Sequence, residues 1–147
     1  MEYLKELSPE DKAELLRAPV VFAVMAAVSD DGMVNSAERT EAIKLSHLRT
    51  YTSPAFLQNF YRQVDEIFEE EFDKLTKALP EDAKSQREFL KEKLAGIRKI
   101  MNKLDRDYAI HLTQSLKSFS RHVFRANSHY LEYFLLPVIM NELEKNF

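Results

Sequence analysis

The 147-residue sequence contains no cysteine and only two glycines. Without cysteine the chain cannot form a disulfide scaffold, a thiolate zinc site, an iron–sulfur cluster or a cysteine nucleophile. Glycine-rich phosphate loops, Rossmann fingerprints and hairpin-rich β folds need several residues at positive φ, which two glycines cannot supply. The scarcity of these residues therefore excludes the commonest nucleotide-binding folds and folds made of many hairpins.

Charge of one sign and long apolar runs are also lacking. The formal net charge is -3, which argues against general nucleic-acid binding, because proteins with that function carry a basic surface. The longest apolar run, Ala18–Val28, has 11 residues and is too short to cross a bilayer. The first residues lack the basic and apolar stretch of a secretory signal. We therefore expect a single cytoplasmic domain over residues 1–147, without a nucleic-acid partner.

Signals that start helices recur along the chain. They are a serine followed by proline, or the spacing of a capping box, and they occur at Ser8–Pro9, Ser53–Pro54 and Asn35–Glu38. The helix that begins at Asn35 is expected to end near Arg49. The run Ala18–Val28 is apolar on all sides and is expected to form a central, buried helix.

Three later segments carry apolar residues at intervals of three and four, the pattern of amphipathic helices. The stripes are Phe56, Phe60, Val64, Phe68, Phe72, Leu75 and Leu79, then Leu90, Leu94, Ile97, Met101 and Leu104, and finally Leu112, Leu116, Phe119 and Val123. A last helix is expected from about His129 to Lys145, with a kink or restart at Pro137. No stretch alternates with period two for long enough to indicate a strand. The sequence therefore predicts an all-α fold of about seven helices.

Opposite charges are concentrated in two neighbouring segments. Residues 65–82 contain eight acids, and residues 84–106 contain eight bases. If these two helices form an antiparallel hairpin joined at Pro80, their opposite charges would face each other. This long charged hairpin has two interpretations, solvated faces that contribute little to stability or a surface that binds a partner.

One loop carries a cluster of oxygen-bearing side chains, namely Ser29, Asp30, Asp31, Asn35 and Glu38. Hard cations such as Ca²⁺ and Mg²⁺ need several oxygens that converge from a tight turn. Gly32 permits the turn, and Glu38 has the spacing of the acid that closes an EF-hand loop. Ala27 stands where that loop would begin with aspartate, so the pattern is an incomplete EF-hand.

The same residues also have a purely structural interpretation. Asp-Asp-Gly is common turn chemistry, and Asn35 with Glu38 forms a capping box. Spacing alone leaves open whether the loop binds a divalent cation or only ends a turn.

The segment Phe22–Glu38 resembles the signature of the TerB-like (tellurite-resistance B) family. An alanine-rich helix leads into Asp-Asp-Gly-x-Val-x-x-x-Glu. The resemblance implies a compact all-helical fold and a divalent-cation site with Asp31 and Glu38 as ligands and Asp30 beside them. It further implies a bacterial protein of stress or tellurite-type resistance that acts through partners, including partners at the membrane. Family members often repeat the acidic element, but the counterpart here, Arg125–Glu132, has no Asp-Gly.

Catalytic and other metal motifs are missing. No Glu-x-x-His or His-Glu-x-x-His occurs, and no nucleophile elbow is present. We therefore expect a non-enzymatic protein. The alternative to cation binding is a metal-free interaction module or homodimer that uses either the charged hairpin or the aromatic C-terminal helix around Tyr130–Leu136.

Overall fold

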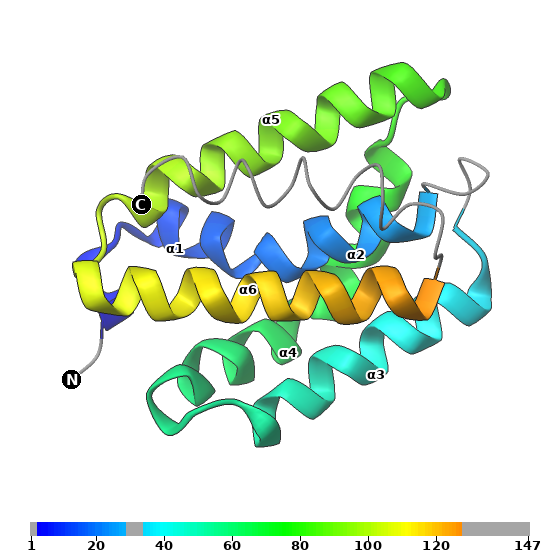
Figure 1. The fold of residues 1–147 in the computed structure, drawn as a ribbon. Helices are drawn as coiled ribbons and strands as arrows, with labels where there is room; N and C mark the ends of the chain where they lie inside the picture. Colours follow the sequence, from blue (N-terminus) through cyan, green and yellow to red (C-terminus); the bar gives the residue numbers. More distant parts are fainter. Residues whose placement is uncertain (1–2, 29–33, 128–147) are drawn as a thin grey trace.

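The computed structural model describes residues 3–28 and 34–127. These residues form a 3-10 helix followed by six α-helices (Figure 1). Their bounds are η1 Tyr3–Glu6, α1 Pro9–Leu16, α2 Ala18–Val28, α3 Ser36–Thr52, α4 Ala55–Ala78, α5 Ala83–Met101 and α6 Arg106–Asn127. No strand occurs over these two ranges, so the all-α prediction is confirmed. The helix expected from His129 to Lys145 lies outside the described residues, and the count of about seven helices stays a prediction.

Of the three predicted helix starts, Ser8 and Asn35 form side-chain caps as expected. Ser53 does not, because Pro54 occupies the N-cap position of α4 and no side-chain hydrogen bond caps that helix.

The hydroxyl Oγ of Ser8 accepts from the backbone N–H of Asp11 at 3.1 Å, and Pro9 occupies the first position of α1, where no N–H is needed. Asp82 caps α5 in the same way, since its Oδ2 accepts from the N–H of Ser85 at 2.9 Å. This contact lowers the pKa of Asp82. Side-chain caps therefore fix where α1 and α5 begin.

A single residue, Arg17, separates α1 from α2. Its N–H donates to the carbonyl of Glu14 at 3.1 Å, and its own carbonyl accepts from Val21 at 2.9 Å. Pro19 lies in the first turn of α2, where a missing N–H leaves no hydrogen bond unmade. The interruption places a charged side chain between two helices that are otherwise largely apolar where they meet.

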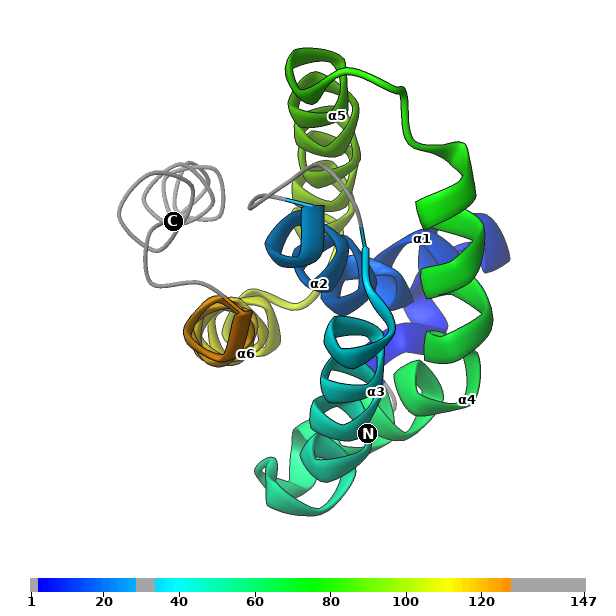
Figure 2. The same ribbon diagram turned by 90° about the vertical axis from the view of Figure 1, so that its right-hand side faces the viewer.

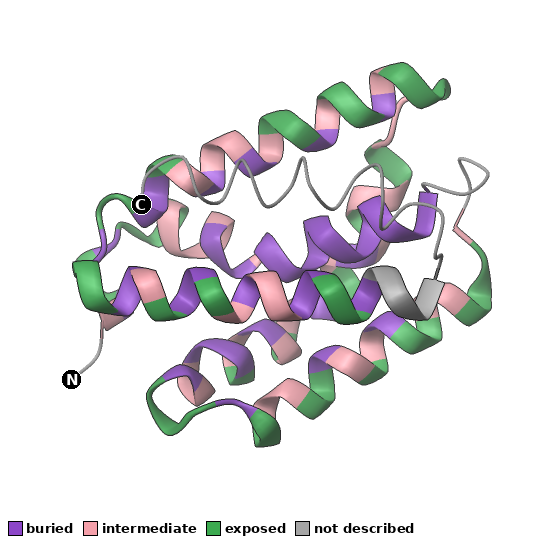
Figure 3. Ribbon diagram, in the orientation of Figure 1, coloured by how far each residue is buried: buried purple, intermediate pink, exposed green. Residues whose placement is uncertain are grey.

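The helix α2 is the centre of the core, as the sequence predicted. All 11 of its residues are buried, and Figure 3 shows it in one colour along its length. It contacts α6 and α4 most extensively, and also α5, α3 and α1. Because a helix without a polar face cannot be solvated, neighbours are required on every side.

The amphipathic stripes of α4, α5 and α6 supply most of those neighbours. Their buried members are Phe60, Val64, Phe68 and Phe72 of α4, Leu90, Leu94, Ile97 and Met101 of α5, and Leu112, Leu116, Phe119 and Val123 of α6. At one end of the α4 stripe Phe56 is 44% exposed, and its ring meets those of Tyr108 and His111 edge-on. At the other end Leu75 and Leu79 are half-buried. The period of three and four therefore identified the buried faces, except at the two ends of the α4 stripe.

The antiparallel docking expected of the charged hairpin is wrong. The helix α4 packs against α3 and α2, whereas α5 packs against α2 and α1. The two charged helices thus diverge from Pro80 around α1 and α2 (Figure 2). Each apolar stripe gains about 1.5–3 kcal/mol for every large side chain that it buries on α2. Exposed ion pairs offer 0–1 kcal/mol each, so burial decides the packing.

Over the ranges that the structure describes, no helix combines the length and apolar character needed to span a membrane.

Candidate functional site

The predicted capping box closes the acidic loop at its C-terminal end. The Oδ1 of Asn35 accepts from the N–H of Glu38 at 2.8 Å, and Oε1 of Glu38 accepts from the N–H of Asn35 at 3.0 Å. Val34, just before the box, is half-buried and packs against the core. The end of the loop is therefore anchored both by an apolar contact and by two reciprocal hydrogen bonds.

The remaining members of the predicted cation site cannot be placed. Asp30 and Asp31 lie outside the described residues, as do Ser29 and Gly32. Of the four residues predicted as ligands, the structure describes only Asn35 and Glu38, and it brings these two together. Both already have structural roles, so their proximity by itself fits either interpretation of the loop.

In the described part of the chain, no group of three or more histidine, cysteine, aspartate or glutamate side chains could hold a metal ion. His47 contacts one carboxylate, with 3.0 Å between its Nδ1 and Oδ2 of Asp65. Nδ1 of His122 lies 2.9 Å from Nη2 of Arg49 and 2.9 Å from the carbonyl of Ser118. These histidines therefore join helices, His47 joining α3 to α4 and His122 joining α6 to α3.

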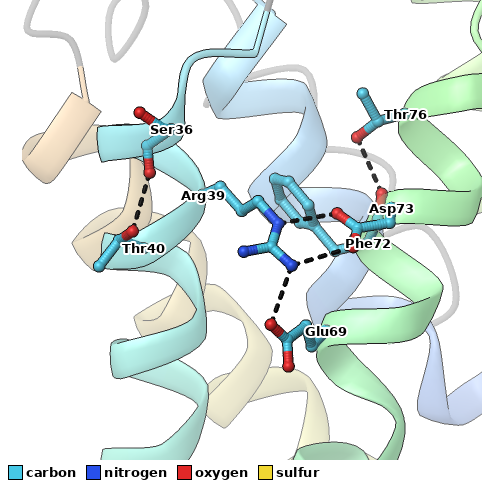
Figure 4. Close-up of polar contacts among 7 residues, drawn as sticks. All are labelled: Ser36, Arg39, Thr40, Glu69, Phe72, Asp73 and Thr76. Atoms are coloured by element: carbon cyan, nitrogen blue, oxygen red, sulfur yellow. Dashed lines mark hydrogen bonds and ion pairs between the residues drawn. The ribbon is translucent and has the colours of Figure 1, made fainter.

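The acids of α4 pair with Arg17 between α1 and α2, with Arg39 of α3 and with Lys74 of α4 itself. Figure 4 shows the contacts of Arg39. Arg39 of α3 donates to Asp73 through two nitrogens, at 2.8 and 2.9 Å, and to Glu69 at 2.9 Å. The hydrogen bond from Arg39 lowers the pKa of Asp73. The hydrogen bonds to Asp73 and Glu69 raise the pKa of Arg39. This Arg39 clamp ties α3 to α4, and no local sequence pattern indicated it, because its partners lie 30 and 34 residues away.

A polar seam crosses the interface of α3, α4 and α6. The hydroxyl of Tyr61, fully buried, lies 2.6 Å from Oγ of Ser115. Burial raises the pKa of Tyr61. The side-chain oxygens of Ser46 and Thr50 on α3, and of Ser53 just after it, are buried without a hydrogen-bond partner in the described structure. Sequence patterns did not identify this seam, because they mark only apolar residues as buried.

A groove lies between α4 and α5, with α2 beneath it. Val20 and Val21 form its floor, Leu75 and Phe89 stand on opposite sides, and its volume is about 210 Å³. It exists because the charged helices diverge instead of docking. We refer to it below as the α4–α5 groove.

Comparisons of the chain with protein-family models, with curated proteins and with solved structures found no match.

Proposed function

We propose that this protein is a non-enzymatic, TerB-like helical protein that binds a divalent cation weakly at the loop between α2 and α3. Ca²⁺ or Mg²⁺ is the expected ion, because every proposed ligand is oxygen. Asp31 and Glu38 are the principal ligands, Asp30 stands beside them, and Asn35 contributes an amide oxygen. The position of Glu38 carries the proposal, because the capping box holds its carboxylate at the end of the loop.

Two features of the described end of the loop agree with weak binding. One oxygen of Glu38 and the amide oxygen of Asn35 already accept backbone hydrogen bonds, so a cation would have to share them. The site also adjoins the N-terminus of α3, where the helix dipole disfavours positive charge by about 0.3–1 kcal/mol. We expect a dissociation constant on the order of 10⁻⁴–10⁻³ M, the weak end of the range for such loops.

Isothermal titration with Ca²⁺, Mg²⁺ and Mn²⁺ tests the proposal in three proteins, the native chain, Asp31→Asn and Glu38→Gln. Glutamine can keep the capping hydrogen bond while it removes the charge, so Glu38→Gln separates cation binding from helix capping. We expect a heat of binding in the native chain and its loss in both variants. We also expect the metal-free melting temperature of Glu38→Gln to stay close to that of the native chain.

Two results would contradict cation binding. One is no heat from the native chain with any of the three ions. The other is an unchanged heat in both variants.

The wider role is proposed from the family resemblance. We propose a bacterial, cytoplasmic protein of stress or tellurite-type resistance that acts through protein partners, some of them at the membrane, and not through nucleic acid. Binding of a cation would link α2 to α3 and stabilise the fold by RT ln(1 + [cation]/Kd), an increment that keeps growing with cation concentration.

The second candidate is a metal-free interaction module or homodimer. Three large hydrophobic side chains favour it, since Leu48, Tyr51 and Phe56 are 49%, 71% and 44% exposed near the turn between α3 and α4. Sedimentation velocity at low and high salt tests the homodimer, because association driven by charge weakens with salt whereas apolar association does not. A monomer at both salt concentrations would leave only the version with a different partner.

A further inference from the structure

The helices α5 and α6 both pack on α2, but within the described residues they form no extensive interface with each other. Figure 2 shows them on two different sides of α2, and on the side away from α4 no described helix stands between them. The described helices therefore leave one side of α2, the side between α5 and α6, without a neighbouring helix.

That side of α2 is nevertheless buried. All 11 residues of α2 are buried, and none of them is polar. An apolar helix with one side open would expose part of its surface to water. The burial of α2 therefore requires a cover in addition to the described helices.

The adjoining side of α5 is buried as well. Phe89 lines the α4–α5 groove, and Leu94 lies five residues further on, about 140° around the helix at 3.6 residues per turn. Leu94 and Met101 are seven residues apart and share one face, and both are 2% exposed. This face is turned away from α4, and α6 does not pack on it.

On α6 the corresponding side carries small residues. Ser115 and Ser118 mark the opposite side, because they contact α4 and α3 respectively. Thr113 and Ser120 lie about 140–160° around the helix from both of these serines. They are nevertheless only 3% and 0% exposed. Neither α3 nor α4 therefore accounts for their burial.

The hydroxyls on this side of α6 need no partner from outside the helix. The Oγ1 of Thr113 donates to the carbonyl of Ala109 at 2.8 Å, and the Oγ of Ser120 donates to that of Leu116 at 2.9 Å. An apolar segment can therefore pack on them without leaving a polar group unpaired. The surface formed by these residues is called below the α5–α6 face, and it consists of Leu94, Met101, Ala109, Thr113 and Ser120.

We propose that the α5–α6 face, with α2 beneath it, is the docking surface of the last segment of the same chain, residues 128–147. Chain connectivity selects this occupant. The helix α6 ends at Asn127, at the same end of the molecule as the end of α2 (Figure 1). A segment that turns back at this point runs along α2 between α5 and α6.

The length and composition of residues 128–147 fit this surface. The helix predicted from His129 to Lys145 would be about 25 Å long at 1.5 Å per residue, whereas the 11 residues of α2 extend over about 16 Å. The run Tyr130–Met140 contains one charged residue, Glu132, and is otherwise almost entirely aliphatic and aromatic. Apolar side chains of this run gain from burial on an apolar surface.

The proposal is independent of cation binding, because it uses no residue of the acidic loop. It assigns the aromatic residues 130–136 to the core of their own chain, so they are not the surface of a homodimer. A second copy could supply the same segment by domain swapping, and the experiment below separates that case.

Distances between spin labels test the proposal on the full chain, which has no cysteine of its own. One label is attached at Asn141→Cys, and the other at one of three exposed positions, Lys91→Cys on α5, Gln114→Cys on α6 or Glu66→Cys on α4. Helices in contact have axes about 8–10 Å apart. The label at 141 should therefore be closer to those at 91 and 114 than to the one at 66, beyond α2. These distances should persist in a large excess of unlabelled chain.

Chymotrypsin cleavage of a variant tests the surface itself. Thr113→Arg places a long cation on the α5–α6 face and should release residues 128–147, so that cleavage after Tyr133 and Phe134 becomes at least about tenfold faster. Gln114→Arg is the matched control, because it adds the same side chain one residue away, at an exposed position on a different face of α6. It should change the rate by less than about twofold.

Three outcomes would overturn the proposal. The first is that the label at 141 lies no closer to positions 91 and 114 than to position 66. The second is equal cleavage of Thr113→Arg and Gln114→Arg when circular dichroism shows both to be folded. The third is loss of the short distances in an excess of unlabelled chain, which would assign the surface to the last segment of a second copy. If Thr113→Arg does not fold, the distances alone decide.

Discussion

At the scale of single residues, the hydroxyl of Ser46 is a buried polar group whose hydrogen-bonding capacity is not satisfied in the described structure. Ser46 is fully buried on α3, and its hydroxyl has no partner in the described structure. Burying an unpaired hydroxyl costs about 1–3 kcal/mol. Ser46→Ala should therefore raise the free energy of unfolding by about 1 kcal/mol, measured by urea denaturation.

Ser120→Ala is the control for that measurement. Ser120 is equally buried, but its Oγ donates to the carbonyl of Leu116 at 2.9 Å. Its removal should leave stability unchanged or lower it. A loss of stability in Ser46→Ala as large as in Ser120→Ala would show that the hydroxyl of Ser46 is satisfied.

Single residues also show what sequence reasoning can find. Ser8, Asn35 and Glu38 were predicted as caps because their hydrogen bonds span three residues and leave a local pattern. The buried hydroxyl of Ser46 and the contact between Tyr61 and Ser115 left no such pattern, since a serine within a helix is usually expected to be exposed to solvent. Asp30 and Asp31, which the cation site needs, lie outside the described residues, so that part of the site stays a prediction.

At the scale of elements, the Arg39 clamp should make the α3–α4 interface sensitive to acid. The clamp depresses the pKa of Asp73 below its usual 3.8, so its stabilising effect is present at neutral pH and is lost as pH falls through the lowered value. Asp73→Asn should therefore melt below the native chain at pH 7, and the two melting temperatures should converge as the pH falls below the lowered pKa of Asp73.

Glu66→Gln supplies the comparison for the acid series. Glu66 is an exposed acid of α4 that forms no ion pair with the described residues. The difference in melting temperature between Glu66→Gln and the native chain should therefore not shrink as the pH falls. A constant gap between Asp73→Asn and the native chain from pH 7 to pH 2.5 would contradict the role of the clamp.

The elements also explain why the charged hairpin was predicted wrongly. The acids of residues 65–82 and the bases of residues 84–106 are adjacent in sequence, which suggested that they pair. In the structure Glu71 and Asp73 pair with Arg17 and Arg39 instead of with bases of α5, because α2 and α3 pack on the apolar stripe of α4. Charge pattern predicts which surfaces are complementary, but burial decides which helices meet.

At the scale of the whole molecule, stability depends on the packing around α2. Phe22 on α2 is fully buried, whereas Phe56 on α4 is 44% exposed. Phe22→Ala should cost about 3–5 kcal/mol in free energy of unfolding, a large share of the 5–15 kcal/mol typical of a domain. Phe56→Ala makes the same chemical change and should cost about 1 kcal/mol. Chemical denaturation followed by circular dichroism measures both, and equal losses would contradict the central role of α2.

The all-α class and the buried position of α2 could both be predicted, since a run of 11 apolar residues leaves no face for solvent. The arrangement of the other helices around it could not. Their apolar stripes are similar in width and composition. Periodicity therefore shows that each stripe must be buried, but it does not show which helix buries it.

The central position of α2 also has a consequence for synthesis on the ribosome. The helix ends at Val28, but α6, with which it has one of its largest interfaces, ends at Asn127. At about 5–20 residues per second, roughly 5–20 s of translation separate the two. During that interval α2, the most apolar segment of the described chain, can contact α1, α3, α4 and α5 but cannot yet complete its interface with α6. Its protection from aggregation at that stage therefore depends on chaperones or on early contacts with α4 and α5.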